Sequence, residues 1–117
     1  MKIKKTSQTT VLQNEIAVDY STDETKTGYN WIDGKPIYRK VIQATNIGTA
    51  FSTGVSNIDT FMFDVSHSYI YYNNSIFFAS DRAKFKYDKT NNTIQTEETA
   101  LATWNGIITI EYTKTTD

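Results

Sequence analysis

The chain has 117 residues, and this length indicates one domain with a single core. It has no cysteine, one histidine and a formal net charge of −1, which excludes disulfide frameworks, thiolate zinc sites and proteins that neutralise many nucleic-acid phosphates. Thr, Ile, Val and the aromatic residues fill 53 positions, whereas Leu occurs twice, so composition predicts an all-β domain.

The N-terminal segment differs in composition from the rest. Residues 1–14 are polar and rich in Lys and Thr, and we expect an arm or linker there. Polar residues follow the basic start, so no secretion signal is predicted, and no apolar run is long enough for membrane insertion. The folded domain is expected over residues 15–117. It would begin with a short strand of alternating residues: Ile16, Val18 and Tyr20 on one side, Ala17 and Asp19 on the other.

The first strong signal is a hairpin centred on Asp33-Gly34. This pair favours a type I′ turn, which needs a positive φ at both central residues, and strand formers flank it. Pro36 follows the turn, where its missing N–H fits a strand start or an edge strand. We expect Trp31 and Tyr38 to pack across the hairpin.

The middle of the chain predicts one strand and two more hairpins. Residues 58–66 read as a strand with Phe61, Phe63 and Val65 on one face. Because Asn tolerates left-handed geometry, residues 69–78 are expected to turn back at Asn73-Asn74, and residues 83–96 at Asn91-Asn92.

The C-terminal part predicts a single helical turn and then a long strand. The turn is expected within residues 97–104. Asn105-Gly106 opens the strand, with Ile108, Ile110 and Tyr112 on one face, opposite to Ile107, Thr109 and Glu111. Turn signals recurring between short strands are typical of a small antiparallel β-sandwich, here jelly-roll-like.

The sequence offers weak candidates for catalysis. His67 follows Asp64 and Ser66 and precedes Ser68, so a nucleophilic triad can be drawn. Neighbours on a strand point to opposite faces, however, and we expect these side chains not to converge. Glycoside hydrolysis uses a pair of carboxylates, and three pairs can be nominated: Asp59 with Asp64, Asp81 with Asp88, and Glu97 with Glu98. The sequence spacing of none of them specifically indicates this chemistry. We therefore expect a non-enzymatic protein without metal or cofactor.

The polar surface is more informative. Forty residues are Ser, Thr, Asn or Gln, and eight Tyr and two Trp accompany them. Aromatic rings beside amide and hydroxyl groups suit sugars, which offer apolar C–H faces and many hydroxyls. These residue types concentrate in residues 69–74. The predicted ligand contacts are Tyr71, Tyr72, Asn73 and Asn74, with Tyr72 on the face opposite to Tyr69 and Tyr71.

Three segments carry a resemblance. The WIDGKPIYRK run at residues 31–40, preceded by YSTDE at 20–24 and followed by IEYTKTTD at 110–117, resembles motifs of bacteriophage and prophage appendage proteins, the distal domains of tail fibres, head fibres and related receptor-binding proteins. The resemblance implies a β-sandwich displayed as a homotrimer that attaches to bacterial surface glycans or proteins. Its motif positions read as structural rather than receptor-binding: Trp31, Asp33, Gly34, Pro36, Ile37 and Tyr38.

Two functions follow as expectations. The first is a fibre tip in the virion, made in the host cytoplasm, that binds host surface polysaccharide through multivalent weak contacts. The alternative is a structural virion component, a head fibre, capsid decoration or tail connector protein, that docks on other virion proteins through residues 1–14. Whether the chain is an excised domain or a stand-alone protein is open. The doubled aromatics Phe77-Phe78 and Tyr71-Tyr72 are compatible with a trimer because they place large side chains on both faces of one hairpin.

Overall fold

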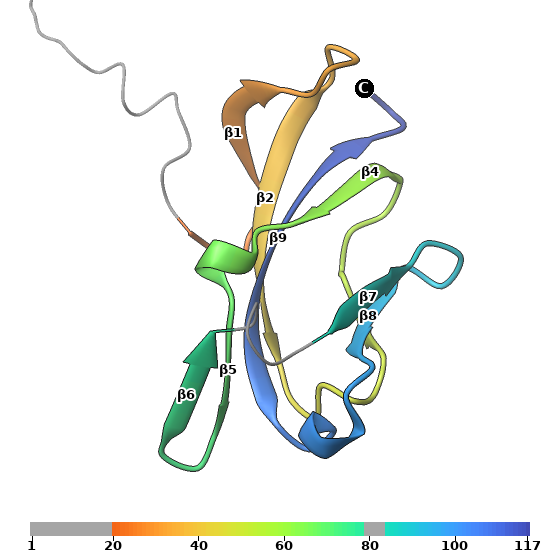
Figure 1. Ribbon diagram of the computed structural model, residues 1–117. Coiled ribbons are helices and arrows are strands. Elements are labelled where there is room, and N and C mark those ends of the chain that lie inside the picture. The colour runs from red at the N-terminus through yellow and green to blue at the C-terminus, as the bar shows by residue number, and fades with distance from the viewer. Residues whose placement is uncertain (1–19, 79–83) are drawn as a thin grey trace, which may run out of the picture.

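The computed structural model describes residues 20–78 and 84–117. The expected arm at residues 1–14, the strand expected from Ile16 apart from Tyr20, and the candidates Asp81 and Ala83 lie outside the described residues. Within the described residues the chain is all-β, with antiparallel strands in two sheets (Figure 1). The all-β antiparallel class predicted from composition and turn spacing is confirmed.

The larger sheet has six strands and is organised around β9. Its order is β1-β2-β9-β5-β6, and β4 also pairs with β9. One edge of β9 pairs with β2, while the other edge is shared, with β4 along residues 110–114 and β5 along residues 105–107. The strands are β1 (Thr25–Asn30), β2 (Pro36–Ala44), β4 (Ile58–Phe63), β5 (Tyr69–Tyr72), β6 (Ser75–Phe78) and β9 (Asn105–Lys114).

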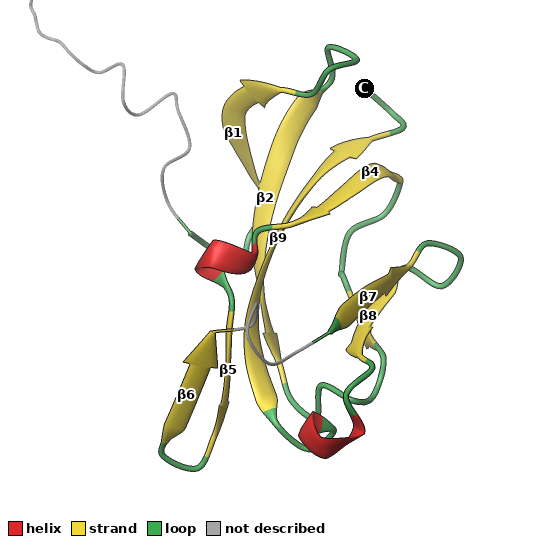
Figure 2. Cartoon of the chain, viewed as in Figure 1, coloured by secondary structure: helices red, strands yellow, loops and turns green. Residues whose placement is uncertain are grey.

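The smaller sheet has the order β3-β8-β7 and packs over one face of the larger sheet. Its strands are β3 (Phe51–Ser52), β7 (Phe85–Asp88) and β8 (Thr93–Thr96). Two 3₁₀ turns, η1 (Val65–His67) and η2 (Thr99–Leu101), are the helical segments in Figure 2. The single turn predicted within residues 97–104 is therefore confirmed by η2.

The core lies between the two sheets, on what we call the inner face of the larger sheet. Ile108, Ile110 and Tyr112 of β9 alternate onto this face and are fully buried, as their spacing predicts. They pack with Ile94 of β8. The opposite, outer face of the larger sheet is not covered by the smaller one. It carries Ile107, Thr109 and Glu111, which is the second row predicted for this strand.

The first hairpin forms where Asp33-Gly34 predicts it, but the type I′ prediction is wrong. Within the loop of residues 32–34 only Gly34 has a positive φ, of 87°. The Gly34 N–H donates to the Trp31 carbonyl (2.9 Å) and the Trp31 N–H to the Lys35 carbonyl (2.8 Å). This pattern is a three-residue loop with a left-handed glycine. The Asp33 carboxylate accepts from the Lys35 N–H (3.0 Å), a local bond that favours this loop over the two-residue one.

For the residues beside this loop, one sequence prediction is confirmed and others are wrong. Pro36 opens β2, as predicted. Ile32, one of the strand formers that flank Asp33-Gly34, lies in the loop instead of a strand and is 91% exposed. The Tyr38 ring stacks on Tyr112 of β9 at a centroid distance of 5.8 Å, instead of packing on Trp31, because the strand register places Tyr38 opposite both Lys26 and Tyr112.

The strand predicted over residues 58–66 ends early, at Phe63. Phe61 and Phe63 pack against the core, as predicted, but Val65 begins η1 and is 45% exposed. The reason lies in the pairing with β9. β4 and β5 follow one another along the same edge, and the chain from Phe63 to Tyr69 faces only the shorter stretch from Ile110 to Ile107. The surplus residues loop out as η1, so the prediction for Val65 is wrong.

The two Asn-Asn turns are confirmed. β5 and β6 meet at Asn73-Asn74, and β7 and β8 are joined through Asn91-Asn92. Asn73 and Asn92 adopt positive φ values of 55° and 56°, the left-handed conformation that Asn tolerates better than most residues.

Asn92 also joins the β7–β8 hairpin to the segment after β3. Its Oδ1 accepts from the Thr53 hydroxyl (2.8 Å) and the Tyr87 hydroxyl (3.0 Å), and its Nδ2 donates to the Val55 carbonyl. We expect Asn92→Gly, which keeps the backbone conformation, to lower the free energy of unfolding by about 2 kcal/mol because buried polar partners lose their bonds. The control Asn57→Gly also starts from a positive φ. Equal urea midpoints for the two variants would contradict this role.

Glu24 confers a pH-dependent contribution to stability. It accepts hydrogen bonds from the Tyr112 hydroxyl and the Lys114 ammonium, both at 2.6 Å. Burial alone raises the pKa of Glu24, but these bonds and the Lys114 charge outweigh it and hold the pKa below its ordinary value. The ionised carboxylate therefore stabilises the fold above the ordinary glutamate range, and this contribution is lost as the pH falls through the lowered pKa.

The test compares Glu24→Gln with wild type in urea at several pH values. We expect the variant to be less stable at pH 7 and the difference to shrink as the solution is acidified. Glu97→Gln is the control because Glu97 lies 3.7 Å from Lys86 in an exposed ion pair, which contributes little. A Glu24→Gln difference that stays constant down to pH 2 would contradict the assignment.

Candidate functional site

The outer face of the larger sheet carries a groove across β2, β9, β5 and β6. It consists of two adjoining hollows of about 500 and 550 Å³ that share Tyr69, Ile76 and Ile107 as lining residues. We call this feature the outer-face groove. Its residues come together through strand pairing, since Ile107 lies opposite Gln43 on one side and Tyr69 on the other.

One half of the groove is polar and aromatic. Gln43, Tyr71, Asn73 and Asn74 line it together with the shared residues. Alternation along β5 places Tyr69 and Tyr71 on the outer face, with ring centroids 6.1 Å apart. The turn places Asn73 and Asn74 at the end of the same strand. Three of the four ligand contacts predicted from sequence, Tyr71, Asn73 and Asn74, therefore lie along one hollow.

Tyr72 lies apart from that hollow. Its ring stacks on Trp104 at a centroid distance of 5.7 Å and an interplanar angle of 18°, and Phe77 also contacts Trp104 at 5.4 Å. These rings belong to the inner side of the β5–β6 hairpin, where Phe77 packs against buried residues. Tyr72 therefore faces the side of the hairpin opposite to Tyr69 and Tyr71, as alternation along the strand predicts. Trp104 had no sequence signal that linked it to the hairpin.

The other half of the groove is largely apolar. Val41 of β2 and Phe78 of β6 line it with the shared residues, and Tyr20 and η1 form its far wall. Ile76 and Phe78 are 71% and 68% exposed because β6 is an edge strand whose alternate side chains point outward. The sequence analysis named Phe78 in the aromatic hairpin and Ile107 in the last strand. It did not group them with Val41 and Ile76 in one surface, since only the strand order brings these residues together.

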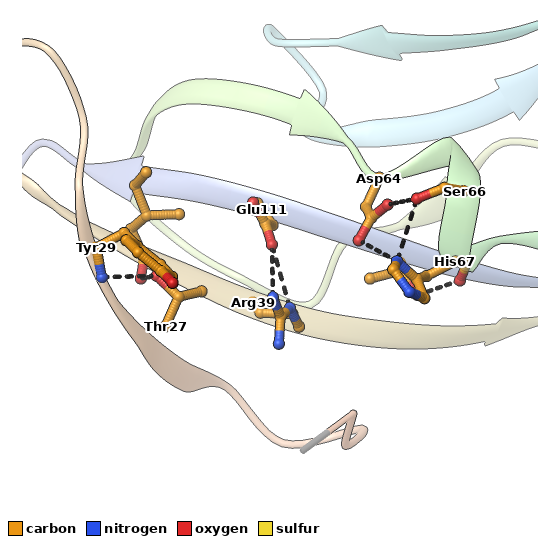
Figure 3. Close-up of polar contacts among 9 residues, drawn as sticks. Thr27, Tyr29, Arg39, Asp64, Ser66, His67 and Glu111 are labelled. Carbon is orange, nitrogen blue, oxygen red and sulfur yellow. Dashed lines mark hydrogen bonds and ion pairs between the residues drawn. The ribbon is translucent and has the colours of Figure 1, made fainter. Parts of the chain in front are cut away.

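The described part of the groove wall carries no formal charge. Among residues 20–78 and 84–117, none of those that line the groove is Lys, Arg, Asp or Glu, and His67 is the one histidine among them. Arg39 lies close by, but it pairs with Glu111 across β2 and β9 (3.1 Å; Figure 3). The Arg39 guanidinium also lies 4.5 Å from the centroid of the Tyr20 ring. The groove therefore offers ring faces and hydrogen-bonding groups to a ligand rather than a net charge.

The side chains of Asp64, Ser66 and His67 converge beside the groove, so the expectation that they point apart is wrong (Figure 3). His67 Nδ1 lies 2.9 Å from Asp64 Oδ2, and the Ser66 hydroxyl lies 2.8 Å from Asp64 Oδ1 and 3.2 Å from His67 Nδ1. Convergence is possible because η1 is a tight 3₁₀ turn, in which residues three apart share a side.

This cluster differs from a nucleophilic triad. In a triad the two ring nitrogens of the histidine take separate partners, the carboxylate and the serine. Here the carboxylate and the hydroxyl both contact Nδ1, and the Ser66 hydroxyl donates directly to Asp64. The contacts are those of a turn held by local hydrogen bonds.

Two of the carboxylates considered as acid–base candidates, Asp59 and Asp88, have partners elsewhere. Asp59 pairs with Lys35 at 2.8 Å, and the hydrogen bond from Lys35 holds the pKa of Asp59 below its ordinary value. Asp88 accepts from the N–H groups of Thr90 and Asn91. Across residues 20–78 and 84–117, no three His, Cys, Asp or Glu side chains gather as metal ligands would.

Comparisons of the chain with protein-family models, curated proteins and solved structures found no match. Within the described residues there is also no helix of the length and apolarity that a membrane span requires. The function of the groove is therefore inferred from its own chemistry.

Proposed function

We propose that this chain is an appendage domain of a bacteriophage virion, and that it attaches to the bacterial surface by holding surface glycans in the outer-face groove. The observation that carries the proposal is the shared hollow of Tyr71, Asn73, Asn74 and Gln43. Aromatic rings pack on the C–H faces of sugars, and amide groups both donate to and accept from sugar hydroxyls.

The phage assignment comes from the resemblance at residues 31–40. In the structure these residues have structural roles: Gly34 takes the left-handed position in the loop, Pro36 opens β2 and Tyr38 stacks on Tyr112. The Tyr38 hydroxyl also donates to Asp117 at 2.7 Å. The residues that line the groove lie elsewhere, which supports the division into a structural hairpin and a separate binding surface.

The proposed assembly is a homotrimer, because three linked sites raise the avidity of individually weak glycan contacts. Light scattering behind a sizing column is expected to give a mass near three times 13.4 kDa. A species of 13.4 kDa at micromolar concentration would contradict the trimer and would leave the groove as a single weak site.

The attachment function is tested with the purified chain on bacterial cells and on an array of bacterial surface polysaccharides. We expect saturable binding that the soluble polysaccharide inhibits, with no release of reducing ends during incubation. Binding to no member of the array and to no cell type would overturn the proposal. Release of reducing ends would show an enzyme instead of a binding module.

A further inference from the structure

The two halves of the outer-face groove present different chemistry to one continuous ligand. They meet at Tyr69, Ile76 and Ile107, which line both. A molecule that spans this junction contacts hydrogen-bonding groups on one side and carbon on the other. The class of ligand that the groove binds therefore depends on which donors and acceptors in each half are not already hydrogen-bonded to the protein.

The polar half has free hydrogen-bonding capacity. Within the described residues, the side chains of Gln43, Tyr71, Asn73 and Asn74 make no hydrogen bond to the protein. Asn73 and Asn74 are exposed at the turn, and Gln43 is exposed on β2. These groups are available for the hydroxyls of a sugar.

The serine and threonine hydroxyls of the apolar half already have partners within the protein. The Ser68 hydroxyl donates to the Asp64 carbonyl (2.8 Å) and accepts from the Thr109 N–H (2.9 Å). The Thr109 hydroxyl donates to the His67 carbonyl (2.6 Å), and the Ser66 hydroxyl donates to the Asp64 carboxylate (2.8 Å). With these three hydroxyl protons used internally, this half offers a ligand mainly the carbon surfaces of Val41, Ile76, Phe78 and Ile107.

The charge of the groove wall also limits which class of ligand the groove can bind. The described residues that line the groove include no Lys or Arg, so a ligand carboxylate or phosphate held against them would lose water without gaining a cationic partner from these side chains, which costs free energy. We propose that the ligand is an uncharged glycan that carries acetyl groups, with its ring and hydroxyls in the polar half and an acetyl methyl in the apolar half. This inference rests on the proposed function and specifies the ligand class of the same site.

The test measures binding of the purified chain to an array of neutral and anionic bacterial polysaccharides. Each polysaccharide is present in its O-acetylated form and after mild alkaline de-acetylation. We expect the chain to bind neutral members, to prefer the acetylated form by about fourfold for each methyl that the groove buries, and to bind with little dependence on salt. Binding to anionic members, or equal binding to both forms, would overturn the inference and leave the attachment function standing. Binding to none of the polysaccharides would overturn the inference, and absence of binding to bacterial cells as well would overturn the attachment function itself.

Two variants test whether the preference for the acetylated polysaccharide arises in the apolar half of the groove. Phe78→Ser removes an exposed ring that lines only the apolar half, and we expect it to lose the preference for the acetylated form while still binding the de-acetylated one. Tyr29→Ser is the matched control, since Tyr29 is 70% exposed on β1 and does not line the groove. An unchanged preference in Phe78→Ser would overturn the assignment of the acetyl group to this half.

Discussion

Replacing Ile110 by alanine is expected to lower the free energy of unfolding by about 3 to 4 kcal/mol. Ile110 is fully buried in β9, where it pairs with Lys40 of β2 and Phe63 of β4 and joins the core cluster with Ile94. Its removal leaves a cavity that strands held on both sides cannot close by shifting. Because a small domain has a total stability of roughly 5 to 15 kcal/mol, this loss is a large fraction of it.

Urea unfolding measures this effect, and the chain contains a matched control. Ile32→Ala makes the same chemical change at a side chain that is 91% exposed in the β1–β2 loop, so we expect a change within about 0.5 kcal/mol. Similar losses in the two variants would contradict the placement of Ile110 at the centre of the core.

Replacing Tyr71 by alanine is expected to weaken binding to the surface polysaccharide by about tenfold or more while leaving the fold intact. Tyr71 is half-buried on the outer face and lies beside Tyr69 in the polar half of the groove. A sugar ring on this side chain would bury apolar surface and gain a directed aromatic contact. Calorimetric titration with the bound polysaccharide measures the loss.

The neighbouring tyrosine provides the discriminating control. Tyr72→Ala alters the same hairpin, but Tyr72 faces the other way and stacks on Trp104, so we expect binding to be retained in the folded variant. If Tyr72→Ala loses binding and Tyr71→Ala does not, the glycan lies on the Tyr72–Trp104 side and the outer-face groove is the wrong site. Thermal unfolding of both variants separates loss of binding from loss of fold.

Local patterns were sufficient to predict much of the fold. The Asn-Asn turns at 73–74 and 91–92, and the alternation of Ile108, Ile110 and Tyr112, depend on residues close together in sequence. The turn at residues 64–68 could not be predicted in this way. It exists because β4 and β5 share one edge of β9 and the surplus residues must loop out, which is a property of strand order.

The residues of the candidate site also divide into those that local sequence could predict and those that depend on strand order. Tyr71, Asn73 and Asn74 were predicted from the chemistry of one short segment, and the structure places them along one hollow. Gln43 and Ile107 were missed because they come from β2 and β9 and reach the groove only through the pairing of these strands with each other and with β5. Similarly, alternation separates Tyr72 from Tyr71, but only the fold brings Trp104 to Tyr72.

The most direct test of glycan binding in the outer-face groove is NMR titration of the purified chain with oligosaccharides cut from the polysaccharide it binds. We predict saturable shifts in the side-chain amide resonances of Asn73, Asn74 and Gln43, which line the groove. The amides of Asn30 and Asn57, which are exposed outside it, should stay unchanged. Shifts centred on the β1–β2 loop or on Trp104, with the three groove amides unmoved, would contradict the account.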